Sequence, residues 1–330
     1  MDVNLSFFIG GIALAVLEEI KGWYGVKRYG VALNIDLINT CPLKCPSCAV
    51  GSIGGRKPAI MDFGDFCYIL DKIGKIRHVQ FYMYSDPCLH PKLDKYVWEC
   101  TKRGIPSYIS TVLQRTNCDF RKLIEARPSE FRISFAGWDK MYYYQAGAEK
   151  EIFDRKVEEV CALPRYPETK WTMVFHLYND NHNEVSKAKK LAEKHKLHFV
   201  IIPSIFMPCE KVVEQNYSDQ DLRLIDCLLQ TPEQSISKMK FHDDYCLLWK
   251  QISVDALGRV YLCQLVYEDR FIVGDIFRDS IKGLMQRIKK HPFCRKCTKV
   301  GGHVYQYCYA DFLKYNDPVG HANKRRIKRA

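Results

Sequence analysis

The sequence lacks an apolar run long enough to cross a bilayer. One apolar segment, 7–17, lies near the N-terminus, but it is too short for a transmembrane helix and follows Asp2 rather than basic residues. It therefore resembles neither a membrane span nor a signal peptide. We expect a cytoplasmic protein with no membrane span. In such a reducing compartment cysteines serve metals or catalysis rather than disulfides.

The chain also lacks an acidic excess. Its 50 lysines and arginines outnumber 38 aspartates and glutamates, which gives a formal net charge of +12. That balance would help to bind nucleic acid, a phosphorylated substrate, an acidic electron donor or anionic lipid. Part of the excess lies in a basic tail, 314–330, and a basic terminal run is more often a solvated end than a binding site. We therefore do not expect nucleic acid as a partner.

The first group of cysteines lacks a fourth member. Cys41, Cys45 and Cys48 have C-x3-C-x2-C spacing and follow an apolar, β-branched segment, 31–38, that predicts a buried strand running into a loop. A closed structural metal site wants four ligands. Three thiolates can instead hold an iron–sulfur cubane by three irons and leave the fourth iron open. Three buried cysteines and half of a zinc site are the alternatives.

The middle of the chain alternates between strand and helix patterns. The predicted strands are 31–38, 78–84, 107–113, 131–135, 171–177 and 198–205, and the helices between them are 63–73, 93–102, 120–125, 149–163 and 183–195. Such alternation indicates a parallel sheet built from βαβ units. Six units are too few for a closed eight-fold barrel, so we expect an open, partial barrel. Chemistry in such folds gathers at the carboxyl ends of the strands.

A second group of cysteines follows the point, near residue 219, where this alternation stops. Cys246 and Cys263 form a C-x11-G-x4-C pattern, and a predicted hairpin over 252–263 brings the two thiols together. Cys294 and Cys297 form a C-x2-C pair after a predicted helix, 280–290. Four thiolates can close either a tetranuclear cluster or a zinc site.

These motifs resemble a known family. The first resembles the signature of the radical S-adenosylmethionine (AdoMet) enzymes. The second resembles the one-cluster form of the twitch/SPASM-like auxiliary domain attached to some of them. The pattern His-Pro-x-Cys-x-x-Cys-x-x-x-Gly-x-His-Val-Tyr over 291–305 extends the likeness, which runs from about residue 31 to 307.

The resemblance implies two clusters. A [4Fe-4S] cluster at Cys41, Cys45 and Cys48 would bind AdoMet. Reductive cleavage of the bound AdoMet would give a 5′-deoxyadenosyl radical. A second, auxiliary [4Fe-4S] cluster would use the second group of cysteines. A flavodoxin- or ferredoxin-type protein would donate the electron.

The expected fold class is α/β, a partial (β/α)6 TIM-like barrel with a small C-terminal cysteine-rich domain that holds the auxiliary cluster. The expected domains are an N-terminal helix in 1–30, the barrel in 31–217, a linker helix in 218–240, the auxiliary domain in 241–313 and the basic tail in 314–330.

The family's second motif, Gly-Gly-Glu-Pro after strand two, has its counterpart here in Tyr-Ser-Asp-Pro at 84–87. Aspartate keeps the charge of glutamate but has a shorter reach, and a plain Ser-Asp-Pro turn is the alternative. Ser47 stands where many members of the family carry an aromatic residue. The implied AdoMet contacts are Ser85, Asp86, Pro87, Thr111 and Ser134.

The implied chemistry is hydrogen abstraction from a small molecule, such as a sugar, cyclitol or other polyol, followed by oxidation or epimerisation. The catalytic candidates are Cys209, whose weak S–H bond suits hydrogen donation, and Glu210 and Lys211, which are suited to substrate contact or proton transfer. Further candidates are Cys308, His176 and His303. A radical modifier of peptide or RNA, and a zinc-binding interaction module without enzymatic activity, are the alternative functions.

Overall fold

The computed structural model describes residues 30–237 and 246–305 of the 330-residue chain. The predicted N-terminal helix, the basic tail and Cys308 lie outside these residues. In the part that is described, no helix is both long and apolar enough to cross a membrane.

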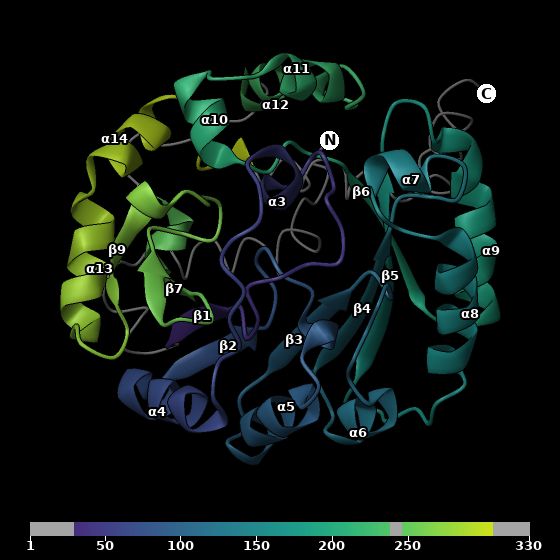
Figure 1. Ribbon diagram of the computed structural model, residues 1–330, viewed down its shortest axis with the longest axis horizontal. Helices are drawn as coiled ribbons and strands as arrows, with labels where there is room; N and C mark the ends of the chain where they lie inside the picture. The colour runs from purple at the N-terminus through teal and green to yellow at the C-terminus, as the bar shows by residue number, and fades with distance from the viewer. Residues whose placement is uncertain (1–29, 238–245, 306–330) are drawn as a thin grey trace, which may run out of the picture.

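A nine-stranded sheet organises the fold, with the strand order β6-β5-β4-β3-β2-β1-β7-β8-β9. The first six strands are β1 Val31–Ile35, β2 Ile76–Gln80, β3 Ser107–Thr111, β4 Glu130–Phe135, β5 Lys170–Leu177 and β6 His198–Pro203. All five pairings among them are parallel, and the strands curve into an open barrel (Figure 1). The predicted α/β fold with a partial six-stranded barrel is therefore confirmed.

Helices cover the outside of this barrel (Figure 1). They are α4 Phe63–Ile73, α5 Leu93–Lys102, α6 Phe120–Glu125, α8 Lys150–Cys161 and α9 Val185–Lys194. Helix α4 is capped at its start by Asp62, whose side chain accepts a hydrogen bond from the amide of Gly64, and after its end by Gly74 with φ of 74°. The predicted helix 183–195 begins instead with a separate 3-10 turn, His182–Glu184, ahead of α9. Two further short helices, α3 Ala49–Ser52 and α7 Met141–Tyr144, lie in loops that follow strands.

The two faces of the parallel sheet differ in chemistry because successive side chains of a strand point to opposite faces. On the outer face, Leu33, Ile109 and Phe131 are fully buried in one apolar core with side chains of the covering helices. The inner face carries mostly polar side chains that strand register places side by side: Asn34, Gln80, Tyr108, Ser110, Arg132 and Ser134. The barrel therefore has an apolar wall and a polar lumen.

The predicted hairpin continues the barrel sheet. Its strands are β7 Gln251–Val254 and β8 Arg259–Tyr261, and β7 pairs in parallel with β1. The turn needs Gly258, which has φ of 79° and packs so closely that a Cβ there would lie 2.2 Å from the ring of Phe277. Strand β9 Ile272–Asp275 and the helices α13 Ile281–Lys290 and α14 Pro292–Lys299 complete this region. The parallel pairing of β7 with β1 was not anticipated from sequence.

The segment between the barrel and the hairpin is helical. It contains α10 Cys209–Glu214, α11 Asp219–Ile225 and α12 Pro232–Ser237, which lie together at one end of the molecule (Figure 1). Two short helices thus stand where one linker helix was expected. The division of the chain into separate domains stays a prediction.

Candidate functional site

The three cysteines of the first motif lie on the loop between β1 and α3, at the carboxyl end of the sheet. The loop turns tightly, since the amide of Cys48 donates to the carbonyl of Cys45 at 3.0 Å and the amide of Gly51 donates to the carbonyl of Cys48 at 3.0 Å. A Cβ on Gly51 would lie 2.2 Å from the Cys45 carbonyl oxygen. The thiol-bearing loop therefore requires glycine at this position.

These three thiols are half-buried and influence one another. Burial raises the pKa of Cys41 well above its usual value, and Asp86 and Cys45 raise it further. Burial also raises the pKa of Cys45, and it raises that of Cys48 to about 11. Thiols in such surroundings do not ionise readily by themselves, whereas a bound metal supplies the positive charge that stabilises thiolates. This donor set fits a metal cluster.

A buried carboxylate fixes the second motif beside the first. Asp36, the residue after β1, accepts hydrogen bonds from the amide of Met83 at 2.9 Å, the amide of Tyr84 at 3.3 Å and the hydroxyl of Ser85 at 2.6 Å. Burial raises the pKa of Asp36, and the nearby Arg56 opposes that shift. Sequence reasoning missed Asp36, although an acid within the apolar segment 31–38 was an available signal.

Asp86 lies in the same region, and its carboxylate oxygens accept hydrogen bonds from neighbouring residues. They accept hydrogen bonds from the amide of Cys88 at 2.9 Å, the hydroxyl of Thr111 at 2.9 Å and the amide of Val112 at 3.0 Å. Burial raises the pKa of Asp86 to about 6. Ser85, Asp86, Pro87 and Thr111 are thus brought together where β2 and β3 end, and the bond between Asp86 and Thr111 joins the two strand ends.

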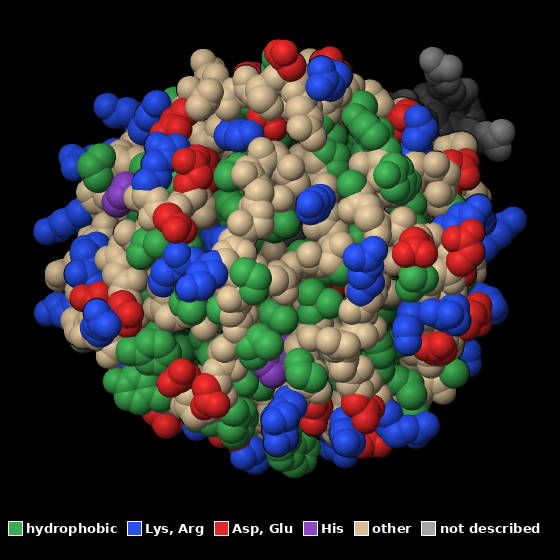
Figure 2. Space-filling model, viewed as in Figure 1, with side chains coloured by type: hydrophobic (Ala, Val, Ile, Leu, Met, Phe, Trp, Pro, Cys, Tyr) green, Lys and Arg blue, Asp and Glu red, His purple; other side chains and the backbone are tan. Residues whose placement is uncertain are grey.

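Ser134, the remaining predicted AdoMet contact, lies on the lumen face of β4. Its hydroxyl is 3.0 Å from that of Ser110 on β3. Below it, Arg132 donates to the hydroxyl of Tyr82 at 2.8 Å and to the carboxylate of Glu130 at 2.6 Å. In the view of Figure 2, charged side chains are sparser near the middle of the molecule than around its edge. His176 shares the lumen face, and burial lowers its pKa to about 4, which keeps the ring neutral.

A half-buried arginine connects the cysteine loop region to the hairpin region. The guanidinium of Arg56 lies 4.0 Å from the ring centroid of Tyr261 and 4.1 Å from that of Tyr267, and it donates to the Tyr267 carbonyl at 2.8 Å. The positive charge of Arg56 also opposes the rise in the pKa of Cys48. Sequence reasoning did not identify Arg56, because its partners lie more than 200 residues further along the chain.

The second group of thiols lines a small cavity. The cavity is lined by Cys209, Cys246, Cys263, Cys294, Cys297 and His303, together with Leu248, Trp249, Leu262, Leu265, Phe293 and Thr298. Burial raises the pKa of Cys246 to about 12 and that of Cys294 to about 11. The predicted hairpin and C-x2-C pair therefore do bring their four cysteines together. Over residues 30–237 and 246–305, no three side chains of His, Cys, Asp or Glu are grouped so as to hold a single metal ion.

Cys209 is a fifth thiol of this cavity. Its Sγ lies 4.0 Å from the Sγ of Cys297 and 3.9 Å from the carbonyl oxygen of Gly302. Its amide donates to the carbonyl of Leu265 at 3.1 Å. The structure thus places Cys209 with the auxiliary cysteines, beside Cys297.

Glu210 and Lys211 are the other predicted catalytic residues. Each makes hydrogen bonds that connect α10 to another segment of the chain. The carboxylate of Glu210 is fully buried and accepts hydrogen bonds from the amides of Tyr267 at 2.8 Å and Glu268 at 3.2 Å. The ammonium of Lys211 pairs with Asp221 on α11 at 2.6 Å and donates to the carbonyl of Ser52 at the end of α3 at 3.3 Å. A substrate contact for either residue stays a prediction.

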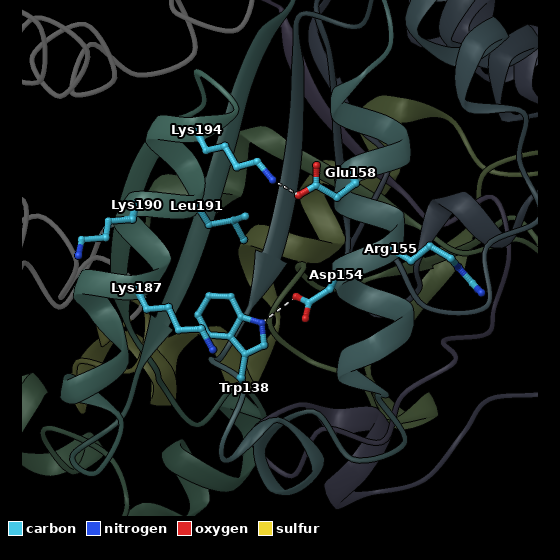
Figure 3. Close-up of a pocket in the computed structure, with 8 residues that line it drawn as sticks. All are labelled: Trp138, Asp154, Arg155, Glu158, Lys187, Lys190, Leu191 and Lys194. Carbon is cyan, nitrogen blue, oxygen red and sulfur yellow. Dashed lines mark hydrogen bonds and ion pairs between the residues drawn. The ribbon is translucent and has the colours of Figure 1, made fainter.

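A separate surface hollow lies on the outer wall of the barrel, between α8 and α9 (Figure 3). Trp138 donates from its indole to Asp154 at 2.8 Å, and Lys194 pairs with Glu158 at 2.5 Å. The ammonium of Lys187 lies 3.9 Å from the centre of the Trp138 ring. None of the cysteines in either group lines this hollow, so it is distinct from both thiol sites.

No protein-family model matches the chain, and no curated protein matches it. Solved structures do match. The structure of anSMEcpe with bound AdoMet overlaps with a TM-score of 0.55 and 15% identity, over 89% of this chain and 99% of that chain. SuiB from Streptococcus suis, bound to precursor peptide SuiA, overlaps with a TM-score of 0.54 and 12% identity, over 89% of this chain and 72% of that chain. BtrN in complex with AdoMet and 2-DOIA overlaps with a TM-score of 0.48 and 15% identity, over 82% and 87%.

At these identities the likeness is one of fold. The first two neighbours confirm the partial barrel predicted from the resemblance to the radical AdoMet enzymes. This chain therefore shares the fold of those two structures, and its own Cys41, Cys45 and Cys48 lie on the loop after β1.

Proposed function

We propose that the protein is a radical AdoMet enzyme. Cys41, Cys45 and Cys48 would hold a [4Fe-4S] cluster, which together with AdoMet supplies a 5′-deoxyadenosyl radical that abstracts hydrogen from the substrate. The observation that carries the proposal is the placement of three neighbouring thiols on the loop after β1, in a fold shared with the AdoMet-bound anSMEcpe. The fold likeness supports the class of chemistry, and the thiol loop supports its location.

The residues that would contact AdoMet are Ser85, Asp86, Pro87, Thr111 and Ser134. The bonds of Asp36 to the backbone at 83–84 hold that loop beside the cysteines, so its remaining backbone groups are positioned for a polar ligand. Ser134 would act directly from the lumen face. Thr111 would act through Asp86, to which it already donates.

We further propose an auxiliary [4Fe-4S] cluster at Cys246, Cys263, Cys294 and Cys297. An auxiliary cluster can accept an electron from a substrate radical, which makes the overall reaction an oxidation. Epimerisation needs a hydrogen donor facing the substrate, and Cys209 lies against Cys297 in the auxiliary cavity. The position of this thiol therefore favours oxidation in our proposal.

The proposed substrate is a small polar molecule of the sugar, cyclitol or polyol type. The support is the polar lumen, where Gln80, Tyr82 and Ser110 present hydrogen-bonding groups suited to hydroxyls. A peptide substrate is the second candidate. The specific observation in its favour is that SuiB, a neighbour of the same fold, was solved bound to its precursor peptide.

The test is anaerobic reconstitution with iron and sulfide, followed by incubation with AdoMet and dithionite. We expect about eight irons per chain from two tetranuclear clusters, and release of 5′-deoxyadenosine. A panel of deuterated polyols and peptides then identifies the substrate by transfer of deuterium into 5′-deoxyadenosine. Protein that binds zinc in place of iron, or that leaves AdoMet intact, would contradict the proposal.

A further inference from the structure

A surface hollow opens beside the first cysteine loop. It is lined by Lys44, Pro46, Tyr142, Tyr143, Ala146, Gln220, Arg223 and Leu224. The lining comes from three segments: the cysteine loop, α7 with the residues that follow it, and α11. Figure 1 shows α3, α7 and α11 in the upper half of the view. Since Lys44 and Pro46 flank Cys45 in the chain, this hollow is the surface directly beside a proposed cluster ligand.

Backbone and aromatic contacts join this surface to the cysteine loop. The amide of Lys44 donates to the carbonyl of Ala146 at 2.8 Å, which fixes the loop against the far side of the hollow. The exposed Tyr143 ring lies 4.9 Å from that of Tyr144, which stacks on Tyr178 at 3.5 Å. The hydroxyl of Tyr178 donates to Ser47 at 3.2 Å, between Cys45 and Cys48. A continuous chain of contacts therefore runs from the surface to the thiols.

The hollow is basic. Lys44 and Arg223 are both exposed, and neither makes an ion pair with any residue in 30–237 or 246–305. Among the described residues, no carboxylate lines the hollow. Tyr142, which is 78% exposed, adds a large aromatic surface of the kind enriched in protein interfaces. Unpaired cations around an exposed aromatic surface complement an acidic partner.

We propose that this hollow, the Lys44–Arg223 surface, docks an acidic one-electron carrier protein that reduces the cluster. The inference rests on the proposed function, which needs an electron from outside the chain. In each transfer the reduced carrier loses one electron and the cluster gains one. No bond is made or broken, and no proton moves.

The charges at this surface would set the association rate of the carrier. Steering by surface charge raises association rates, and salt weakens it. The hollow between α8 and α9 supplies a matched control. It also carries exposed cations, including Lys190, but it lies on the outer wall of the barrel and has no residue of the cysteine loop in its lining (Figure 3).

The experiment compares Arg223→Glu, the double variant Lys44→Glu/Arg223→Glu and the control Lys190→Glu. Binding of purified flavodoxin is measured by titration calorimetry at low and high salt, and 5′-deoxyadenosine release is measured with reduced flavodoxin or with dithionite. We expect the double variant to bind flavodoxin about tenfold more weakly at low salt, Arg223→Glu to lie between it and wild type, and the difference to shrink at high salt. Lys190→Glu should bind like wild type, and Arg223→Glu should keep the dithionite-driven rate.

Equal binding by the double variant and wild type, or equal weakening by Lys190→Glu, would overturn the docking surface. In either case dithionite-driven cleavage of AdoMet by wild type would leave the proposed function standing. If wild type cleaves no AdoMet with dithionite, the proposed function fails, and the docking inference fails with it.

Discussion

The two groups of thiols differ in how they meet solvent. Cys41, Cys45 and Cys48 are half-buried on a loop whose neighbouring side chains form an open, basic surface. The second group and Cys209 line a small cavity walled mostly by aliphatic and aromatic side chains, and four of these five cysteines are buried. The first group has three thiols, fewer than a closed metal site needs, and it lies beside an accessible surface. In the second, a surplus of thiols lies in a mostly apolar cavity.

This difference indicates different tasks. A site that must exchange a ligand and accept an electron needs an open coordination position and a path to the surface. A site that only stores or relays electrons is better kept from water, because solvent exposure and hydrogen bonds to the sulfurs set the potential of an iron–sulfur cluster. The first group fits the former description, and the second fits the latter.

The largest effect is expected from removing a thiol of the first group. Cys45→Ala should lose the cluster, about four of about eight irons per chain, and all measurable cleavage of AdoMet. Iron and sulfide analysis and chromatography of 5′-deoxyadenosine measure both outcomes. Cys67→Ala on α4 is the control and should behave like wild type. Undiminished cleavage in Cys45→Ala would end the assignment of this loop.

Removing a thiol of the second group should separate the two tasks. Cys294→Ala should also lose about four irons per chain. It should still cleave AdoMet, because the first group is intact, while oxidation of a substrate stops. The checks are iron content, 5′-deoxyadenosine release and the spectrum of the reduced protein. Loss of AdoMet cleavage in this variant would show that the two groups do not act independently.

Sequence reasoning found both groups because thiol spacing is local information. The loop spacing of Cys41, Cys45 and Cys48 and the hairpin turn at Gly258 are each set within a short stretch of chain. The six strands and their helices were found for the same reason, since periodicity is local, although four of the predicted strands extended two to four residues past the observed ends.

What could not be predicted depends on contacts between distant segments. The pairing of β7 with β1 joins residues more than 200 positions apart, and no local pattern specifies it. The same is true of Cys209, whose approach to Cys297 depends on how α10 packs. Asp36 is a different case, because an acid within the apolar segment 31–38 was visible and only its role of holding 83–85 required the fold.

The next largest effect is expected from crowding the loop that carries Cys41, Cys45 and Cys48. Gly51→Ala would push a Cβ to within 2.2 Å of the Cys45 carbonyl, so the loop must shift. We expect lower cluster occupancy and a loss of roughly 1–3 kcal/mol in the free energy of unfolding of the metal-free protein, the usual cost of overpacking. Gly55→Ala is the matched control, since a Cβ there meets nothing within 4 Å. Iron content and urea unfolding report the two effects, and equal behaviour of the two variants would refute the steric argument.

A smaller effect is expected at Arg56, where the cysteine loop region meets the hairpin region. Arg56→Ala removes the guanidinium packed on Tyr261 and Tyr267, and we expect a loss of about 2 kcal/mol in the free energy of unfolding, as for a desolvated cation–π contact. Lys57→Ala, at the exposed neighbouring position, should change stability by less than about 0.5 kcal/mol. Urea unfolding of the metal-free proteins measures both. If the two variants lose equal stability, the cation–π contact does not join these regions.

The smallest effect is expected at Cys209, the fifth thiol of the second cavity. It tests whether Cys209 is a ligand of the auxiliary cluster or only lies beside it. If Cys246, Cys263, Cys294 and Cys297 hold the auxiliary cluster, Cys209 is a thiol whose Sγ lies 4.0 Å from the Cys297 Sγ. Cys209→Ala should then keep about eight irons per chain and shift the potential of the auxiliary cluster downward by tens of millivolts, because hydrogen bonds to cluster sulfurs raise the potential. Spectroelectrochemical titration measures the shift, with Cys161→Ala at the end of α8 as the control. Loss of about four irons from Cys209→Ala would instead make Cys209 a ligand, and the surplus thiol would be one of the other four.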